Sequence, residues 1–365
     1  MQVMKMSDSK PSLLTIYFQL MKLRVVILLQ ITAVCAIMAH DLMVRSGALT
    51  GERTWMDTLL AISITILGGT LAAGGSNAIN MVYDRDIDVG MSRTRTRPIP
   101  EGYITPRHAL IFGITISLIG CAIFYPIHWK AVFWTMFSVL FYVLIYTMWL
   151  KRRTPQNIVI GGVAGSTPPL IGWVVASAQS IPDNLNPFDL GSPIPWMLFA
   201  LIFFWTPPHF WALALYRSGE YKKVGVPMMP DIKGPERTLF ESKVYCVMLF
   251  AIGSVPFFWP EYGLPPAWLL LSGVITLWYA ISVWNIDIDE ELDSDGRLPS
   301  AFASFMRSLG YLAWMFIGFV YIVAVPISQI WYWTFGFFLI VPVVNHLMIK
   351  WKNSVQSKRT VLNAE

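Results

Sequence analysis

Residues 57–88 read DTLLAISITILGGTLAAGGSNAINMVYDRDID, an apolar segment that ends in a run of charge. The apolar part, 57–82, exceeds the roughly 20 residues that a helix needs to cross a bilayer. Directly after it come three carboxylates, at Asp84, Asp86 and Asp88. Because an ionised side chain at membrane depth costs roughly 2.5 kcal/mol or more, such a cluster at the end of an apolar segment indicates a functional site.

The whole chain has the composition of a polytopic membrane protein. Of its 365 residues, 55% are hydrophobic, 14% aromatic and 13% charged, and the mean hydropathy is +0.54. The apolar runs are continuous rather than alternating, which excludes a β-barrel. We therefore predict an all-α bundle of about ten membrane-spanning helices, at residues 17–39, 57–82, 106–126, 130–149, 156–179, 194–216, 240–259, 264–284, 304–325 and 329–349.

Lysine and arginine predict the orientation, since loops rich in these residues stay in the cytoplasm. In the ten-helix arrangement, one side of the membrane receives only Arg45, Arg53 and Lys130 before residue 243. The other side receives the basic runs near residues 22, 93, 107, 152, 222 and 237. The basic C-terminal tail joins this side only if the helix count is even, so we predict that both termini and the basic loops are cytoplasmic. The net charge of +5 then reflects topology in the lipid bilayer, and no nucleic-acid partner is indicated.

Two negative expectations concern cysteine and targeting. The three cysteines, Cys35, Cys121 and Cys246, fall inside predicted helices at no metal-ligand spacing, so we expect buried thiols and no disulfide. The first apolar run is too long for a signal peptide, and the residues before it do not resemble a transit peptide. A prokaryotic plasma (inner) membrane is the simplest location.

The chemistry is expected on the basic side. Asn80, Asp84 and Asp88 recur every four residues, so on a continuing helix their oxygens share one face. Such oxygens suit Mg²⁺, which proteins usually hold through one or two carboxylates plus substrate phosphates. Nearby cations that can neutralise phosphate oxygens are Arg93, Arg95, Arg97 and Arg107. The alternative is that these arginines only enforce orientation and pair with the acids in solvated loops.

A second charged cluster follows the sixth predicted helix. Residues 216–231 read YRSGEYKKVGVPMMPD, and four predicted helices separate this cluster from the first. Both clusters therefore face the same side of the membrane. This spacing favours two halves with a shared cavity between their basic ends.

Five segments resemble one known family. They are NMVYDRDIDVGMSRTRTRPIP (80–100), YTMWLKRRTPQNIVIGG (146–162), GSTPPLIGW (165–173), FWTPPHFWALAL (204–215) and VGVPMMP (224–230). In this order they resemble the UbiA superfamily of intramembrane prenyltransferases and, within it, the protohaem IX farnesyltransferase (haem O synthase) family, over roughly residues 20–325. The resemblance implies nine core helices in a domain of residues 1–325. Residues 326–365 would then form an additional tenth helix and a basic cytoplasmic tail.

The resemblance also implies an activity. It is the Mg²⁺-dependent transfer of a farnesyl group from farnesyl diphosphate to a vinyl group of haem b, a substrate rather than a cofactor, giving haem O for terminal oxidases. Haem A synthase or a terminal oxidase would be a candidate partner. Two alternatives stay open: a UbiA-type enzyme that prenylates an aromatic quinone precursor, and a transporter with acidic coupling sites.

Individual roles follow from the matched segments. The metal ligands implied are Asn80, Asp84, Asp88 and Glu220, the last standing where the family usually has aspartate. The catalytic residues implied are Asn80, Asp84, Asp88, Lys151 and Asn157. The substrate-binding residues expected are Arg93, Arg97, Tyr146, His209, Glu220 and Tyr221. Asp231 stands where an apolar residue is expected, as an auxiliary ligand or a solvated group.

His209 stands out because of its neighbours. It follows Pro207 and Pro208 within an apolar run, and prolines there free backbone carbonyls, which is tolerable where the gap lines a protein cavity. The family resemblance makes His209 a candidate for haem iron ligation or porphyrin positioning, and imidazole is a good iron ligand. The alternative is a histidine that hydrogen-bonds to a freed carbonyl beside the kink.

Overall fold

A computed structural model describes residues 11–217, 219–293, 297–331, 334 and 336, and its secondary structure is helical. Nine helical segments of the described residues are long and apolar enough to cross a membrane. They are α2 (Leu23–Arg45), α3 (Trp55–Tyr83), α5 (Pro106–Ile123), α6 (Trp129–Leu140) continued by the π-helix η1 (Phe141–Leu150), α7 (Asn157–Ser166) with α8 (Pro168–Ala176), α9 (Ile194–Tyr216), α12 (Pro235–Phe258), α13 (Ala267–Trp284) and α14 (Pro299–Ala324).

The predicted nine-helix core is therefore confirmed, whereas most of the proposed tenth helix, 329–349, lies outside the described residues. The predicted first helix, 17–39, is wrong at both ends. The chain turns at Lys22, whose φ of 51° is left-handed, and this turn separates a short helix α1 (Leu13–Met21) from α2. α2 then continues to Arg45 through the polar pair His40 and Asp41.

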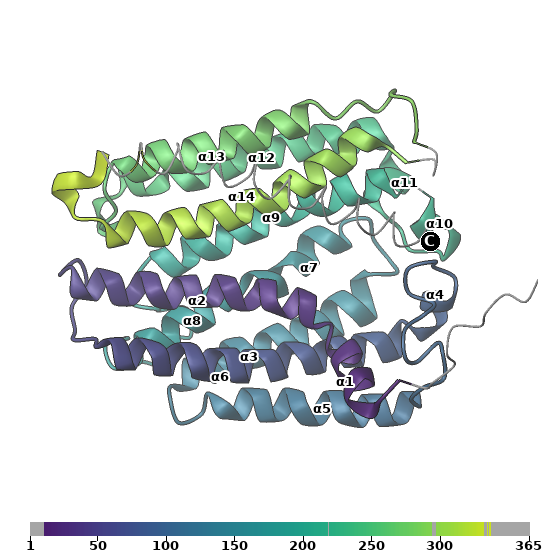
Figure 1. Cartoon of the computed structure of the whole chain (residues 1–365), viewed down its shortest axis with the longest axis horizontal. Coiled ribbons are helices and arrows are strands. Elements are labelled where there is room, and N and C mark those ends of the chain that lie inside the picture. Colours follow the sequence, from purple (N-terminus) through teal and green to yellow (C-terminus); the bar gives the residue numbers. More distant parts are fainter. Residues whose placement is uncertain (1–10, 218, 294–296, 332–333, 335, 337–365) are drawn as a thin grey trace, which may run out of the picture.

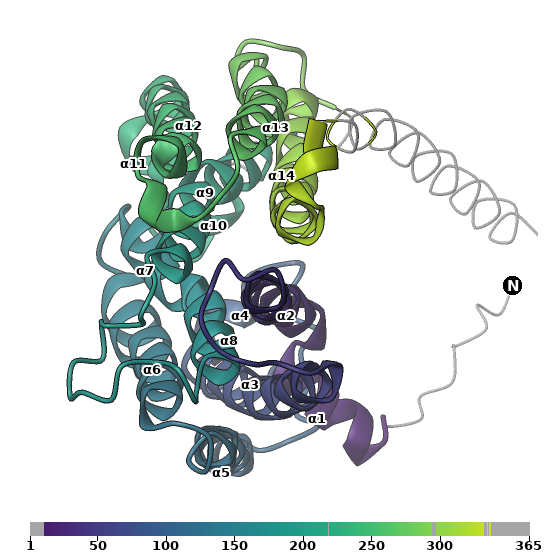
Figure 2. The ribbon, with the colours of Figure 1, turned by 90° about the vertical axis from the view of Figure 1, so that its left-hand side faces the viewer.

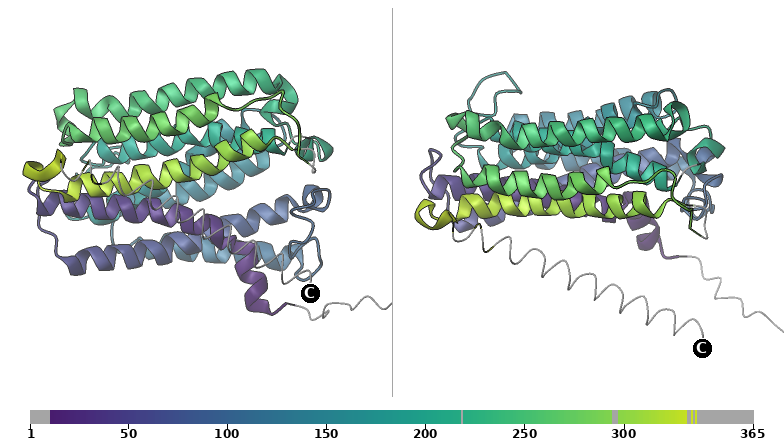
Figure 3. Two further views of the ribbon diagram at one scale, coloured as in Figure 1. Left: turned by 45° about the horizontal axis from the view of Figure 1, so that its top comes forward. Right: turned by 90° about the horizontal axis from the view of Figure 1, so that it is seen from above.

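The nine spans share one long axis (Figures 1 and 3). Figure 2 looks along that axis and shows α12, α13 and α14 in one half, and α2, α3, α5 and α6 in the other. α7 and α9 pack together and join the halves on one side, while α2 contacts α14 on the other. The larger cluster of buried apolar side chains joins α9, α12, α13 and α14 to α2 and α8, and a second cluster lies among α2, α3, α6 and α8.

Small residues allow α3 and α5 to pack closely. A Cβ placed on Gly120 would lie 2.4 Å from the Ala72 nitrogen, and one on Gly113 would lie 2.9 Å from the Gly75 oxygen. Such close backbone approach is the usual basis of helix association in lipid, where the hydrophobic effect between helices is absent. The three cysteines are buried and free, as expected.

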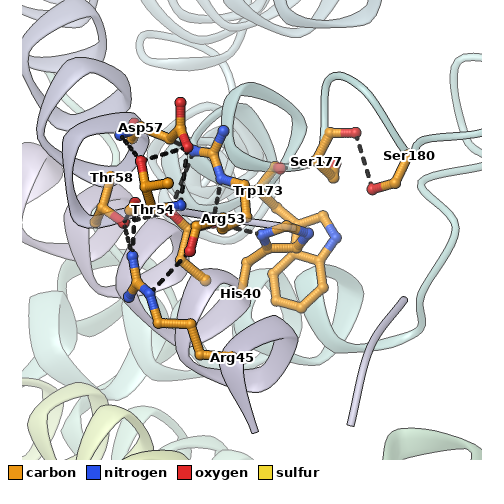
Figure 4. Close-up of polar contacts among 10 residues, drawn as sticks. His40, Arg45, Arg53, Thr54, Asp57, Thr58, Trp173, Ser177 and Ser180 are labelled. Carbon is orange, nitrogen blue, oxygen red and sulfur yellow. Dashed lines mark hydrogen bonds and ion pairs between the residues drawn. The ribbon is translucent and has the colours of Figure 1, made fainter. Parts of the chain in front are cut away.

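A buried polar cluster joins α2 to α3 at the end of the bundle opposite to the short helix α4 (Arg85–Val89) (Figures 1 and 4). Asp41 is completely buried and accepts four hydrogen bonds. His40 Nδ1 donates to it at 2.8 Å, Arg53 donates through Nε at 2.9 Å and Nη2 at 3.1 Å, and Thr58 Oγ1 donates at 2.7 Å. Arg45 completes the cluster by donating to Thr58 Oγ1 at 2.6 Å. Both Asp41 oxygens are therefore satisfied, which indicates a structural role.

Replacing Asp41 with alanine should strongly destabilise the bundle, because removing one partner of a buried ion pair costs about 3–5 kcal/mol by leaving the other charge uncompensated. The measurement is the thermal unfolding midpoint of the purified protein in detergent. Asp57→Ala is the matched control, since it removes a carboxylate of the same cluster that lies at the surface and caps α3. A loss no larger than that of Asp57→Ala would contradict the structural role.

Candidate active site

The two charged clusters of the sequence lie at the same end of the bundle (Figure 1). The first occupies the end of α3 and the helix α4, and the second occupies α10 (Glu220–Lys223) and α11 (Met229–Lys233). The loops touch, because a Cβ on Gly90 would lie 2.7 Å from Val224 Cγ1. The two charged clusters, which are more than 130 positions apart in the chain, thus meet at this end of the bundle.

The helical i to i+4 spacing of Asn80, Asp84 and Asp88 continues through the junction of α3 and α4. The Asp84 N–H donates to the Asn80 carbonyl and the Asp88 N–H donates to the Asp84 carbonyl, both at 2.9 Å. All three side chains are buried, with exposed fractions of 3% for Asn80, 0% for Asp84 and 2% for Asp88. Asn80 and Asp84 converge, since Asn80 Nδ2 donates to Asp84 Oδ2 at 2.9 Å.

Two lysines complete this pair. Lys151 Nζ donates to Asp84 Oδ2 at 2.5 Å, and Lys22 Nζ donates to Asn80 Oδ1 at 2.7 Å. Burial, together with repulsion from Arg97 and Lys151, lowers the pKa of Lys22 to about 7. In the sequence, Lys22 indicates only the orientation of the chain. Its position beside Asn80 depends on the left-handed turn between α1 and α2, which no sequence pattern predicts.

One Asp84 oxygen stays open. Among the described residues, Asp84 Oδ1 is buried and has no hydrogen-bond partner, and the nearest cation recorded for it is Arg152 Nη2 at 3.9 Å. A buried carboxylate oxygen without a partner costs free energy of about 1–3 kcal/mol or more. Its presence beside Asn80 fits a site for a hard cation that takes oxygen ligands.

Asp88 is held differently from Asp84. Arg97 Nη1 donates to both its oxygens, at 2.9 and 2.7 Å, and Thr94 Oγ1 donates to its backbone carbonyl at 2.9 Å. Asp88 thus anchors the loop after α4. The structure brings Asn80 and Asp84 together and leaves Asp88 paired with an arginine of the predicted phosphate-binding set.

The outer arginines fall into two groups. Arg152 donates to both oxygens of Asp86, at 2.6 and 2.7 Å, which holds the pKa of that carboxyl at about 2. Arg93 and Arg95 are exposed to solvent. Asp86 therefore neutralises Arg152, whereas the role of Arg93 in substrate binding stays a prediction.

Two tyrosines form an aromatic wall next to these polar residues, since Tyr142 Oη donates to Asn77 Oδ1, one turn before Asn80, at 3.3 Å. Tyr142 and Tyr146 stack with their ring centroids 5.5 Å apart, and both lie on the π-helix η1, a rare geometry that is frequent at functional sites. Gly161 of α7 makes room for Tyr146, because a Cβ there would lie 2.3 Å from the ring. Tyr146 and Tyr221 pack against the same buried apolar cluster, which contains Ile158.

Asn157 links this wall to the second cluster. Its Nδ2 donates to the Pro227 carbonyl at 3.0 Å and to the Thr154 carbonyl at 2.6 Å. Within the described part of the chain, its buried Oδ1 has no partner. Asn157 therefore fixes the loop before α11 and keeps one acceptor available.

Among the described contacts, Glu220 does not contact Asp84. It pairs with Arg217 at 3.3 Å. In the described ranges, no three His, Cys, Asp or Glu side chains are grouped so that they could hold a metal. Coordination at Asp84 would therefore use Asn80, phosphate oxygens and water, and the role of Glu220 as a ligand stays a prediction.

Burial raises the pKa of Asp231, in the second charged cluster.

His209 lies deeper, on the part of α9 that contains Pro207 and Pro208. It is 6% exposed, and its ring stacks between Trp205 and Phe305 with centroid distances of 4.2 and 4.7 Å. Its Nδ1 lies 2.5 Å from Ser308 Oγ on α14. The alternative in which His209 binds a carbonyl freed by the prolines is therefore wrong, since the partner is a hydroxyl on another helix.

Comparisons with known proteins agree with this architecture. The model of the UbiA prenyltransferase family matches residues 42–309. A relative from Mesorhizobium japonicum named protoheme IX farnesyltransferase 2 is 37% identical over 309 residues, covering 83% of this chain and 88% of the relative. The protoheme IX farnesyltransferase of Brucella ovis is 41% identical over 266 residues, covering 72% and 79%.

Solved structures share the fold. A structure described under digeranylgeranylglyceryl phosphate synthase superposes with a TM-score of 0.64 at 15% identity and covers 85% of this chain and 98% of its own. A UbiA homologue from Archaeoglobus fulgidus bound to GPP and Mg²⁺ has a TM-score of 0.58 at 18% identity and covers 85% and 100%.

The helical bundle and its acidic, lysine-bordered end define a multi-pass membrane protein with a polar site at one end of its helices. The chain belongs to the UbiA prenyltransferase family.

Arg97→Ala should destabilise the protein, because it leaves the buried Asp88 carboxylate without its partner. Removing one member of a buried pair costs about 3–5 kcal/mol, and the 21% exposure of the Arg97 side chain places the expected loss below that range. The measurement is thermal unfolding in detergent, with the exposed Arg93→Ala as control. Asp88→Asn in the Arg97→Ala background should recover stability, and failure to recover would mean that the unpaired charge is not the cause.

Proposed function

We propose that this protein transfers a farnesyl group from farnesyl diphosphate to a vinyl group of haem b (protohaem IX) and so produces haem O. The relatives that carry the corresponding name match at 37–41% identity over most of the chain. The observation that carries the proposal in the site is the buried Asn80–Asp84 pair, bordered by Lys22 and Lys151, with one Asp84 oxygen open.

The donor set fits magnesium. Asn80 and Asp84 would hold the ion, with Asp88 available if Arg97 moves to a phosphate, and a bound Mg²⁺ supplies Lewis-acid stabilisation of diphosphate oxygens. A structural relative of this fold is bound to GPP and Mg²⁺, which supports the same substrate class here. Glu220 remains a proposed second ligand.

The lysines and arginines stabilise the leaving group. Breaking the bond between carbon and diphosphate builds negative charge on the diphosphate, and cations already in place stabilise that charge without reorganising. Lys22 and Lys151 reach the site from the α1–α2 turn and the end of η1, on either side of the acids. Arg93 and Arg97 lie on the loop above and are proposed to bind the outer phosphate.

The tyrosines face the carbon end of the substrate in this proposal. An allylic cation needs a site without water, and aromatic faces attract a cation by roughly 0.5–2 kcal/mol. The stacked Tyr142 and Tyr146 are proposed to present such faces, and Tyr142 Oη donates to Asn77 Oδ1, one turn before Asn80, at 3.3 Å. Tyr221 packs against the same cluster as Tyr146. Asn157 keeps an open acceptor oxygen close to this wall, and we propose that it positions a substrate group.

Haem b is the proposed acceptor, with His209 as the residue that orients it. We place the site and both termini on the cytoplasmic side of a prokaryotic plasma membrane, in agreement with the distribution of lysine and arginine. Delivery of haem O to haem A synthase or a terminal oxidase is the proposed downstream step.

The direct test incubates membranes containing the protein with haem b, farnesyl diphosphate and Mg²⁺, and analyses the haem by mass spectrometry. We expect farnesylated haem, lost on addition of EDTA. Membranes that prenylate 4-hydroxybenzoate but leave haem b unchanged would retain the prenyltransferase and reject the acceptor.

Asp84→Asn should lower the rate of haem farnesylation by at least about 10²–10³-fold, the loss typical for one preorganised electrostatic contact. The substitution keeps the size of the side chain and removes the charge that pairs with Lys151. Asp86→Asn is the matched control two residues away on α4, because Asp86 is exposed and pairs only with Arg152 in the described contacts. Comparable losses in both variants would argue against a specific role for Asp84.

A further inference from the structure

The surroundings of His209 restrict the ways in which its ring can meet a ligand. Trp205 and Phe305 cover the two faces of the imidazole, with interplanar angles of 21° and 24°. Ser308 Oγ occupies the Nδ1 edge. Phe210 contacts the ring in a T-shaped arrangement, with the ring centroids 4.9 Å apart. Among the described residues, Nε2 has no hydrogen-bond partner, so a ligand that reaches His209 would engage the ring through that nitrogen in the plane of the ring.

The hydroxyl of Ser308 indicates which nitrogen carries the proton. Ser308 Oγ donates to the Phe305 carbonyl, one turn earlier in α14, at 2.5 Å. This back-bond to the preceding turn is a common arrangement for serine within a helix. With its hydrogen used there, the oxygen can only accept from His209, so Nδ1 carries the hydrogen and Nε2 keeps its lone pair.

Both partners of this hydrogen bond are fixed in place. Ser308 is completely buried, and its backbone carbonyl accepts a hydrogen bond from Trp205 Nε1 at 2.8 Å. Trp205 also stacks on His209 and lies one turn before it on α9. α9 and α14 are therefore joined by two polar contacts at the same level, and the ring cannot rotate without breaking one of them.

We propose that Ser308 is a positioning residue that holds His209 with Nδ1 protonated and presents the Nε2 lone pair to the haem iron. This inference rests on the proposed function, because it takes haem b as the acceptor. Histidines that bind a metal almost always donate their other ring N–H to a second group, which fixes the ring and raises its basicity. A neutral imidazole with a free Nε2 is the form that binds iron.

The test titrates ferric haem b into the purified full-length protein and its variants, and follows the absorption and EPR spectra of the complex. Ser308→Ala should weaken haem binding by about 10–100-fold, the usual effect of removing the hydrogen-bond partner of a metal-binding histidine. It should also alter the spectrum and raise the midpoint potential, since the ligand becomes less basic. Ser308→Thr keeps the hydroxyl and should restore the haem affinity, the spectrum and the midpoint potential, while the KM for farnesyl diphosphate stays unchanged.

Ser304→Ala is the matched control. Ser304 lies one turn away on α14, is also completely buried, and its hydroxyl contacts Ser282 at 3.2 Å, so its loss reports the cost of removing a buried hydroxyl from this helix. A purely structural role for Ser308 would produce the same small loss of stability in both variants and leave the haem spectrum of each unchanged. That result would overturn the proposal.

His209→Ala separates this inference from the proposed function. Loss of the wild-type spectrum in His209→Ala, together with an altered one in Ser308→Ala, is the expected result. An unchanged spectrum in His209→Ala would remove iron ligation, and with it the role of Ser308, even if the wild-type protein still farnesylates haem b. Failure of the wild-type protein to farnesylate haem b would instead reject the proposed function, whatever the spectra show.

Discussion

The active end of the molecule depends on burying the Asp84 carboxylate. Because the Asp84 side chain is completely buried, its carboxylate is stable only if cations and hydrogen-bond donors contact it. Here they come from separate parts of the chain: Asn80 from the same helix, Lys151 from the end of η1, and Arg152 from the loop that follows. The junction of α3 and α4, the π-helix and the turn at Lys22 all bring polar groups to this one point.

The two ends of the bundle show what separates a structural polar cluster from a functional one. At the end of the bundle opposite to α4, Asp41 accepts four hydrogen bonds and both of its oxygens have partners. At the α4 end, Asp84 is as deeply buried as Asp41, yet among the described residues its Oδ1 has no partner. Since an unsatisfied buried oxygen is costly, its persistence makes sense where a ligand completes it. Asp41 and Asp84 are both completely buried carboxylates, so they differ in whether both oxygens have hydrogen-bond partners.

Sequence reasoning predicted the periodic features and missed those that depend on tertiary contacts. The apolar runs gave the nine spans, and the four-residue spacing correctly indicated that Asn80 and Asp84 converge. The alternative in which the arginines pair with the acids anticipated a pair such as Asp88 and Arg97. It placed the pair in a solvated loop, whereas Asp88 is buried, and the irregular loop between the two residues carries no pattern that indicates this burial. Lys22 and Ser308 were missed for a related reason. Each acts on a residue at least 58 positions away in the chain, and neither carries a local signal of its role.

The prolines of α9 illustrate how a local rule can point to the right residue for an incomplete reason. Pro207 and Pro208 drew attention to His209 because they free backbone carbonyls, but the imidazole does not use them. Its Nδ1 contacts Ser308 of α14, and the rings of Trp205 on α9 and Phe305 on α14 cover its two faces. A histidine that only repaired the helix would donate its N–H to a freed carbonyl of α9 itself, whereas His209 bonds to a residue of α14. The contact with a second helix leaves Nε2 available and ties the position of the ring to the packing of the two helices, which is what precise placement of a large planar substrate requires.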